Sequence, residues 1–213
     1  KKIGFQNYYG RQDYASDKRF GGDDDFDGNW GIWDEPFLQF FCAKMNRMRQ
    51  PFMTALFTVS SHHPFVIPDK YKNIYTEGEL PIHKCIRYTD MAIGKFFQSA
   101  RKQSWFRNTI FIITSDHTNQ SNHAEYKTGI GEFSAPVIIY DPSATTVKPG
   151  MRDAVAQQID IMPTVLDIIG YDKPYLAFGC DVLKTPASQT YALSYLNGIY
   201  QYVKYGYTLQ FDG

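Results

Sequence analysis

The feature that constrains the fold most is an apolar run, Thr-Ile-Phe-Ile-Ile at residues 109–113, that leads straight into Thr-Ser-Asp-His-Thr at 114–118. A continuous run of apolar, largely β-branched residues predicts a strand that is buried on both faces. Residues 52–59 form a similar run, which ends in Ser-Ser-His-His-Pro at 60–64, and residues 136–140 form a third. Such strands need elements that cover both faces of their sheet.

Helical patterns along the chain supply that cover. Residues 34–49 and 80–101 carry apolar side chains at spacings near 3.6. Residues 161–169 predict a third helix, with Asp160 as its N-cap and Gly170 just beyond its end. Because strands alternate with helices, we predict an α/β fold with a mainly parallel sheet flanked by helices on both faces.

The pattern changes toward the C-terminus. Residues 189–195, 199–204 and 206–211 are rich in Tyr and β-branched residues, and Asn197-Gly198 and Tyr205-Gly206 separate them. Such dipeptides between short strand-like runs are typical of tight hairpin turns. The sequence therefore predicts a small antiparallel meander at the C-terminus.

Length and charge exclude some classes of protein. At 213 residues the chain fits one domain or a large part of one. Lys plus Arg and Asp plus Glu both number 22, and this balance argues against nucleic acid as the main partner. No apolar stretch approaches the roughly 20 residues of a membrane span, and no signal peptide is visible. The three cysteines are widely spaced, and we expect buried or half-buried thiols, with one disulfide as the alternative.

The polar clusters that follow the first two runs are candidates for a binding site. The carboxyl ends of parallel strands meet at one edge of a sheet, where ligands gather in open α/β folds. Asp116 and His117 offer one oxygen and one nitrogen there, which suits Zn²⁺ or Mn²⁺ better than Ca²⁺. The alternative is a loop in which Asp116 caps a turn and His117 faces water. Further ligands are needed, and the local candidates are His62, His63 and His123.

An ion at this edge would polarise a phosphoryl or sulfuryl oxygen and activate a hydroxyl nucleophile. Imidazoles on the facing loop would donate hydrogen bonds to the anionic oxygens. We assign that role to His62, because Pro64 stiffens the loop that carries it. His63 and His123 also fit loop histidines bonded to backbone or solvent, so they are secondary candidates.

A second candidate metal site lies near the N-terminus. Asp23, Asp25, Asp27 and Asp34 fall at positions 1, 3, 5 and 12 of a calcium-loop pattern, with Gly28 at position 6. Position 12 prefers Glu, and no convincing helix precedes the loop. The alternative interpretation is a solvated acidic turn.

Several passages, taken together, resemble one family. They are residues 29–35 (NWGIWDE), 58–65 (TVSSHHPF), 115–117 (SDH), 158–166 (QIDIMPTVL) and 175–181 (YLAFGCD). The combination resembles the sulfatase-like catalytic domain of the alkaline phosphatase superfamily. Within that superfamily it is most similar to the lipoteichoic acid synthase and phosphoglycerol transferase branch.

The resemblance implies an activity and a set of roles. It implies transfer of phosphoglycerol from phosphatidylglycerol to a glycolipid or envelope glycan, through a covalent phospho-threonine intermediate. Asp116 and His117 would bind one divalent cation, with Mn²⁺ expected and Mg²⁺ or Zn²⁺ as alternatives, and His62 would contact the phospholipid headgroup. Such enzymes are anchored in the bacterial cytoplasmic membrane, with this domain on the extracytoplasmic face, in the periplasm or on the outer surface.

The chain departs from the family pattern in one respect. The Thr nucleophile and a Glu ligand of the family precede the Asp-His pair, and no Thr here stands in a matching position. We therefore expect residues 1–183 to be the C-terminal part of a sulfatase-like catalytic domain, with 184–213 its β-meander. By this expectation the nucleophile and the membrane anchor lie upstream, and the chain alone is catalytically inactive.

Two other functions remain open from the sequence. One is a sulfatase or phosphodiesterase on the same fold, which the missing nucleophile segment would distinguish. The other is a non-catalytic relative that binds a glycan or a lipid headgroup, which the high aromatic content of 16% also fits.

Overall fold

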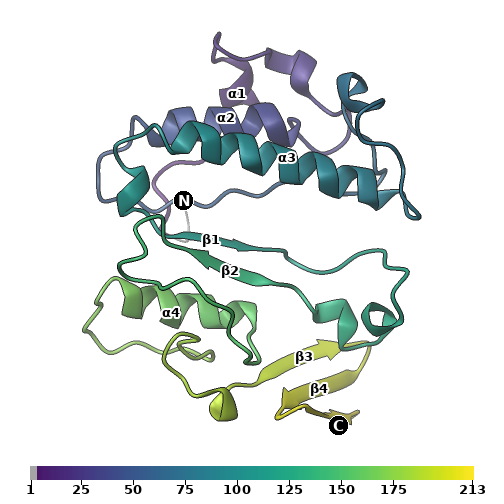
Figure 1. Cartoon of the computed structure of the whole chain (residues 1–213), viewed down its shortest axis with the longest axis vertical. Helices are drawn as coiled ribbons and strands as arrows, with labels where there is room; N and C mark the ends of the chain where they lie inside the picture. The colour runs from purple at the N-terminus through teal and green to yellow at the C-terminus, as the bar shows by residue number, and fades with distance from the viewer. Residues whose placement is uncertain (1–3) are drawn as a thin grey trace. The chain divides into compact units, whose positions relative to one another are not determined.

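The structure is a computed structural model and describes residues 4–213. The chain divides into two units, one that ends at Phe106 and one from Arg107 to Gly213, and each is described by itself (Figure 1). No helix in the described part of the chain has the length and apolar character needed to cross a membrane.

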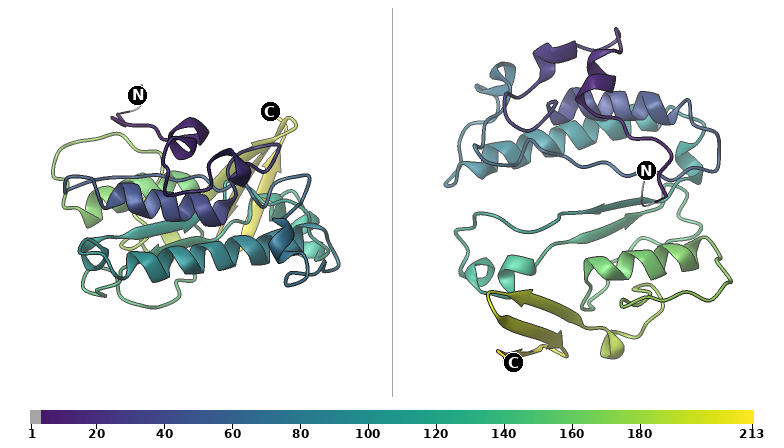
Figure 2. Two further views of the ribbon diagram at one scale, coloured as in Figure 1. Left: turned by 90° about the horizontal axis from the view of Figure 1, so that it is seen from above. Right: turned by 180° about the vertical axis from the view of Figure 1, so that it is seen from behind.

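Helices dominate the first unit. They are α1 (Arg11–Ala15), α2 (Asp34–Met45) and α3 (Ile82–Ala100). Helices α2 and α3 lie side by side, as Figures 1 and 2 both show. They confirm the two helices predicted over 34–49 and 80–101.

Residues 52–59 do not form the predicted buried strand. They pair with no other strand among the described residues, and Met53 and Phe57 are 75% and 67% exposed. A strand needs a neighbour that satisfies its backbone N–H and C=O groups, and an apolar composition does not supply one. The segment instead leads into the loop that carries His62.

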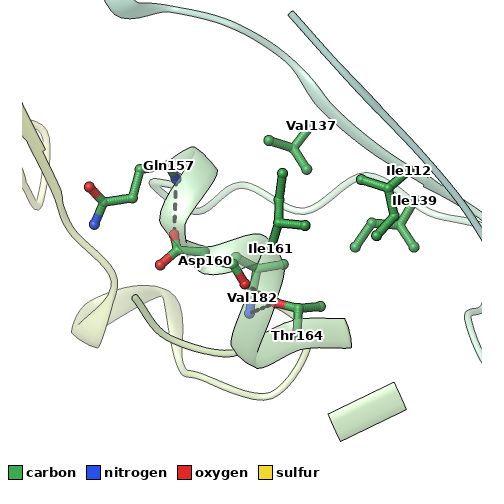
Figure 3. Close-up of a pocket in the computed structure, with 8 residues that line it drawn as sticks. All are labelled: Ile112, Val137, Ile139, Gln157, Asp160, Ile161, Thr164 and Val182. Carbon is green, nitrogen blue, oxygen red and sulfur yellow. Dashed lines mark hydrogen bonds between the residues drawn. The ribbon is translucent and has the colours of Figure 1, made fainter. Parts of the chain in front are cut away.

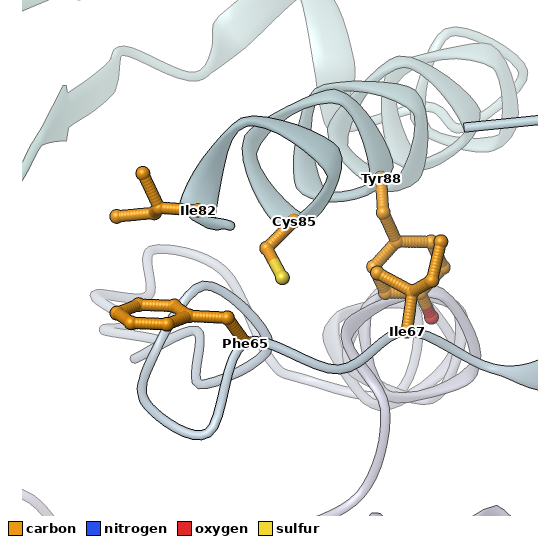
Figure 4. Close-up of a cluster of buried hydrophobic side chains, with 5 residues drawn as sticks. All are labelled: Phe65, Ile67, Ile82, Cys85 and Tyr88. Carbon is orange, nitrogen blue, oxygen red and sulfur yellow. The ribbon is translucent and has the colours of Figure 1, made fainter. Parts of the chain in front are cut away.

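The hydrophobic core beneath that loop is compact. Phe65, Ile67, Ile82, Cys85 and Tyr88 are all buried, and Figure 4 shows the side chains of α3 facing those of the 65–67 segment. Because Phe65 and Ile67 belong to this core, the chain just after Pro64 is fixed against α3. All three cysteines are free thiols, with Cys42 and Cys85 buried and Cys180 half-buried, as predicted.

The second unit contains a two-stranded sheet, β1 (Phe111–Thr114) and β2 (Val137–Tyr140). Both strands were predicted, but they pair antiparallel, with Phe111 opposite Tyr140. The described residues hold no parallel pair, in contrast to the mainly parallel sheet that we expected. A parallel pair needs a crossover connection, usually a helix, whereas the segment between β1 and β2 has only two short 3-10 turns.

Helix α4 (Ile161–Ile168) packs on this sheet. Ile161 and Thr164 face Ile112, Val137 and Ile139 across a small apolar cavity (Figure 3). This confirms the predicted third helix and places its first turn close to the end of β1.

The C-terminal end of α4 was predicted correctly, whereas the side-chain cap at its N-terminal end was not. Gly170 has a φ of +70°, and the N–H groups of Gly170 and Tyr171 donate to the carbonyls of Asp167 (3.0 Å) and Leu166 (2.9 Å). This is the Schellman arrangement expected of a glycine at C′. Asp160 precedes the helix, but its side chain makes no capping bond to it. Its carboxylate accepts from the backbone of Gln157 and Cys180 instead.

The predicted C-terminal meander is confirmed. Its strands are β3 (Ala192–Leu196), β4 (Ile199–Lys204) and β5 (Tyr207–Phe211), all antiparallel. Asn197-Gly198 and Tyr205-Gly206 have positive φ at both positions, which is the geometry of the tight turns that suit hairpins.

Candidate functional site

Asp116 and His117 lie just beyond the end of β1 and form a pair. His117 Nε2 is 3.5 Å from Asp116 Oδ2, and the two side chains are 57% and 53% exposed. Two ligand atoms that each lie about 2.1 Å from one ion are separated by about 3.0–3.5 Å. The oxygen and nitrogen of this pair are therefore spaced to share one cation.

A backbone carbonyl fixes the tautomer of His117. His117 Nδ1 lies 2.6 Å from Thr118 O. A carbonyl oxygen can only accept a hydrogen bond, so Nδ1 carries the hydrogen and the lone pair is left on Nε2. This is the arrangement that orients histidine ligands in metal sites.

Hydrogen bonds to two other segments of the second unit hold the loop that carries this pair. Thr118 Oγ1 donates to Glu132 O at 2.7 Å. Gln158 Nε2 donates to Ser115 O and to Asp116 O, both at 2.8 Å. This role of Gln158 could not be predicted from the sequence, because the contact spans more than forty residues.

The pair has no third ligand near it in the described residues, where no three His, Cys, Asp or Glu side chains are grouped to hold a metal. His123 Nδ1 instead faces Glu125 at 3.9 Å, and its ring packs edge-on against Tyr126. Asp116 and His117 thus fit a divalent cation as two of its ligands, and His123 remains a secondary candidate.

In the first unit, a buried carboxylate organises the loop of His62. Asp34 is 3% exposed and accepts from Val59 N (2.9 Å), Ser60 N (3.2 Å) and Thr89 Oγ1 (2.8 Å). Ser60 Oγ accepts in turn from Asp34 N at 3.0 Å. The first turn of α2 therefore anchors residues 59–60, which are separated by one residue from the two histidines.

The indole ring of Trp30 packs against His62 at an interplanar angle of 50°. The ring centroids of Trp30 and His62 are 4.0 Å apart. Trp30 Nε1 (2.7 Å) and His62 Nδ1 (3.1 Å) both contact the carbonyl oxygen of His63. Since that oxygen only accepts, Nδ1 of His62 carries a hydrogen, and Nε2 is the ring nitrogen left for a ligand.

Trp30 and His63 also line an open hollow of about 430 Å³ with Gly28, Asn29 and Pro64. Hydrogen bonds hold the turn formed by residues 27–31. Asp27 Oδ1 accepts from the backbone N–H groups of Asn29 (2.8 Å), Trp30 (2.8 Å) and Gly31 (3.0 Å). Trp30 remains 56% exposed and presents a fixed aromatic face. From the sequence Trp30 was considered only as an aromatic that would fit a binding protein, and its contact with His62 was not recognised.

The four carboxylates of the calcium-loop pattern have separate partners. Asp23 pairs with Arg11 at 2.7 Å, and Asp25 accepts from the Tyr14 hydroxyl. Asp27 and Asp34 accept from the backbone as described above. The structure therefore lends the calcium hypothesis no support, and it remains a prediction for a calcium titration.

Glu35 forms a charged cluster next to Asp34. Its carboxylate contacts Lys95 Nζ (2.5 Å), Lys70 Nζ (2.9 Å) and the Tyr71 hydroxyl (2.8 Å). Burial raises the pKa of Glu35, but the hydrogen bonds from Lys95, Lys70 and Tyr71 outweigh it and hold the pKa below its ordinary value. The cluster ties α2, α3 and the turn Asp69–Tyr71 together.

The sequence of the chain is similar to known proteins along most of its length. A protein-family model described as Sulfatase matches residues 1–171. Lipoteichoic acid synthase 1 of Bacillus subtilis is 28% identical in an alignment 196 residues long, which covers 83% of this chain and 30% of that protein. Lipoteichoic acid synthase of Staphylococcus aureus is 28% identical in an alignment 177 residues long, which covers 76% of this chain and 27% of that protein. The chain thus spans less than a third of the length of these relatives.

Solved structures share the fold. A protein in the alkaline phosphatase superfamily from Vibrio parahaemolyticus matches 94% of this chain and 50% of its own, with a TM-score of 0.74 and 25% identity. Ps i-CgsB in complex with k-i-k-neocarrahexaose matches 84% of this chain and 47% of its own, with a TM-score of 0.63 and 19% identity. These matches confirm the α/β fold of the alkaline phosphatase superfamily.

Proposed function

Because the chain belongs to the sulfatase family, we propose that it is part of an enzyme that transfers phosphoglycerol from phosphatidylglycerol to a glycolipid or an envelope glycan. The observation that carries this proposal is the spacing of Asp116 Oδ2 and His117 Nε2, 3.5 Å apart at the end of β1. The similarity to two lipoteichoic acid synthases supports the class of donor and acceptor.

Asp116 and His117 would hold one divalent cation, which we propose to be Mn²⁺, with Mg²⁺ or Zn²⁺ as substitutes. Such an ion polarises a phosphoryl oxygen and favours the ionised form of a hydroxyl nucleophile. The contribution of the chain is to fix the two ligand atoms. The Thr118 carbonyl sets the tautomer of His117, and Gln158 and Glu132 hold the loop.

His62 would bind the phosphoglycerol headgroup. Its Nδ1 is occupied by the His63 carbonyl, so Nε2 is the nitrogen left for a ligand. In the protonated ring, Nε2–H can donate a charge-assisted hydrogen bond to a phosphate oxygen. Trp30 packs against the ring in a tilted contact and restricts its movement, and His63 is a secondary candidate for the same ligand.

The remaining parts of the reaction centre would come from the rest of the parent protein, the natural protein that contains this chain. We propose that they include a Thr nucleophile, which forms the covalent phospho-threonine intermediate, and a Glu ligand. The parent would be anchored in the bacterial cytoplasmic membrane with this domain on the extracytoplasmic face. The chain alone would then be inactive.

A sulfatase or phosphodiesterase is the second candidate function, and the match to the Sulfatase family model favours it. A non-catalytic protein that binds a glycan or a headgroup is the third, and the exposed face of Trp30 beside an open hollow favours it. The three functions differ in what the parent protein releases from which substrate.

One experiment separates them. The parent protein is supplied with Mn²⁺ and assayed in parallel on a fluorescent phosphatidylglycerol and on an aryl sulfate, with His117→Ala as the test variant and His83→Ala on α3 as the matched control. We expect lipid release by the wild type and by His83→Ala, and none by His117→Ala. Sulfate release would replace the assignment with a sulfatase. Release of neither lipid nor sulfate would favour the non-catalytic binding protein.

A further inference from the structure

Two adjacent glutamines before α4 reach different parts of the second unit. Gln157 Nε2 donates to Tyr191 O at 3.0 Å, and Gln157 Oε1 accepts from Leu193 N at 3.2 Å, so this side chain ties the turn to the C-terminal meander. Gln158 Nε2 instead donates to Ser115 O and Asp116 O, both at 2.8 Å. The two glutamines thus attach one turn to two different segments, the C-terminal meander and the loop after β1.

Buried hydrogen bonds and a close backbone contact fix the turn that carries both glutamines. Asp160 is 1% exposed, and its carboxylate accepts from Gln157 N (2.9 Å) and Cys180 N (2.7 Å); Figure 3 shows the first of these bonds. Thr164 Oγ1 donates to Asp160 O at 2.7 Å. Gly179 approaches so closely that a Cβ there would lie 2.4 Å from Ile159 O. The backbone of Gln158 is therefore held by a buried network.

The contact of Gln158 involves the two peptide groups on either side of Asp116. A side-chain amide has two N–H donors, and the two carbonyls account for both of them. Holding both carbonyls restricts the backbone rotation that would swing the Asp116 carboxylate away from His117. The side chains of Asp116 and His117 are more than half exposed, so packing alone does not restrict them.

We propose that Gln158 is a positioning residue for the metal-ligand pair, which clamps the Ser115 and Asp116 carbonyls and so holds Asp116 Oδ2 beside His117 Nε2. This inference rests on the proposed function, because it takes Asp116 and His117 as ligands of the cation. Outer-shell partners of metal ligands commonly account for about 10-fold to 100-fold in metal affinity. Gln158 acts through the backbone of a ligand and touches neither ion nor substrate.

The test is a Mn²⁺ titration of the parent protein, followed by the electron paramagnetic resonance signal of the free ion. Gln158→Met removes both donors and keeps the length of the side chain. Gln157→Met makes the same change one residue away. We expect Gln158→Met to weaken Mn²⁺ binding about 10-fold to 100-fold. We expect Gln157→Met to lower the melting temperature and leave the Mn²⁺ affinity at the wild-type value.

Two further variants make the outcomes distinguishable. Gln158→Asn keeps the amide but is one methylene too short to reach both carbonyls, so it should weaken Mn²⁺ binding even if Gln158→Met folds poorly. His117→Ala should abolish binding. Wild-type affinity in both Gln158 variants, with binding lost in His117→Ala, would overturn the inference and leave the proposed function intact. Equal losses in the Gln157 and Gln158 variants would also overturn it. Unchanged binding in His117→Ala would overturn both proposals.

Discussion

His62 and His117 share one hydrogen-bonding arrangement. Each directs Nδ1 to a backbone carbonyl one position later in the chain, His63 O at 3.1 Å and Thr118 O at 2.6 Å. In both rings the second nitrogen is therefore left for a ligand. The difference lies in the neighbours, because His117 has a carboxylate beside it and His62 has an indole ring. This difference supports a metal ligand in one case and an anion-binding group in the other.

His62→Ala tests that division of roles in the parent protein. The variant loses one charge-assisted hydrogen bond to the substrate, so kcat/KM for phosphatidylglycerol should fall about 10-fold to 100-fold. Its Mn²⁺ affinity should stay at the wild-type value, unlike that of His117→Ala. A His62→Ala protein with weakened Mn²⁺ binding would contradict the assignment, and His83→Ala serves as the control for both readouts.

Asp34 is the residue on which the loop of His62 depends. Asp34→Ala would leave the N–H groups of Val59 and Ser60 without their acceptor in a buried place, which should lower the free energy of unfolding by about 2–3 kcal/mol. Urea denaturation measures the change. Asp24→Ala, at an exposed carboxylate ten residues earlier, should stay within about 0.5 kcal/mol of the wild type. Equal effects of the two substitutions would contradict this role of Asp34.

Sequence reasoning located some of these residues and missed the roles of others. Asp116, His117 and His62 stand out because they follow apolar runs or lie in recognisable motifs. Asp34 was interpreted as a candidate calcium ligand, whereas its partners lie 25 to 55 residues further along the chain. Gln158 contacts a loop 42 and 43 residues before it. Side-chain bonds to distant backbone leave no periodic pattern, so one sequence does not reveal them.

Local sequence patterns correctly predicted the helices and the C-terminal meander. The periodicity of 34–49, 80–101 and 161–169 predicted α2, α3 and α4, and the Asn-Gly and Tyr-Gly turns predicted the meander. The pairing of β1 and β2 was predicted wrongly, because strand direction depends on the connection between strands and not on the strands themselves. Residues 52–59 failed as a strand for a similar reason, since pairing requires a partner.

Gly170→Ala tests the predicted end of α4. Alanine at a φ of +70° is strained, so the substitution should lower the free energy of unfolding by about 1–2 kcal/mol. Gly150→Ala in the same unit is the matched control, because its added methyl group meets open space and should change stability by less than about 0.5 kcal/mol. Both are measured by urea denaturation. A neutral Gly170→Ala would show that the Schellman turn contributes nothing.

At the scale of the whole molecule, the Glu35 cluster predicts how stability depends on pH. The pKa of Glu35 is below its ordinary 4.5 in the folded chain. A lowered pKa stabilises the fold above the unfolded-state value, and this stabilisation is lost as the pH falls through the folded-state value. The free energy of unfolding should therefore decrease on acidification below about pH 4.5.

Glu35→Gln isolates this contribution. The variant should be less stable than the wild type at neutral pH, and the difference should shrink as the pH falls toward about 3. Denaturation at a series of pH values measures it. Glu125→Gln, at a carboxylate that is 66% exposed, should follow the wild-type curve. A stability difference between Glu35→Gln and wild type that is independent of pH would contradict the role of this carboxylate.

In the proposed function, Asp116 and His117 hold a divalent cation that the transfer of phosphoglycerol requires. The most direct measurement strips the parent protein with a chelator, adds Mn²⁺ back, and follows phosphatidylglycerol cleavage in wild type, His117→Ala and His83→Ala. We predict that chelation stops cleavage, and that Mn²⁺ restores it in the wild type and His83→Ala but not in His117→Ala. Cleavage that survives chelation, or that returns in His117→Ala at the same Mn²⁺ concentration, would mean that this pair does not hold a required cation.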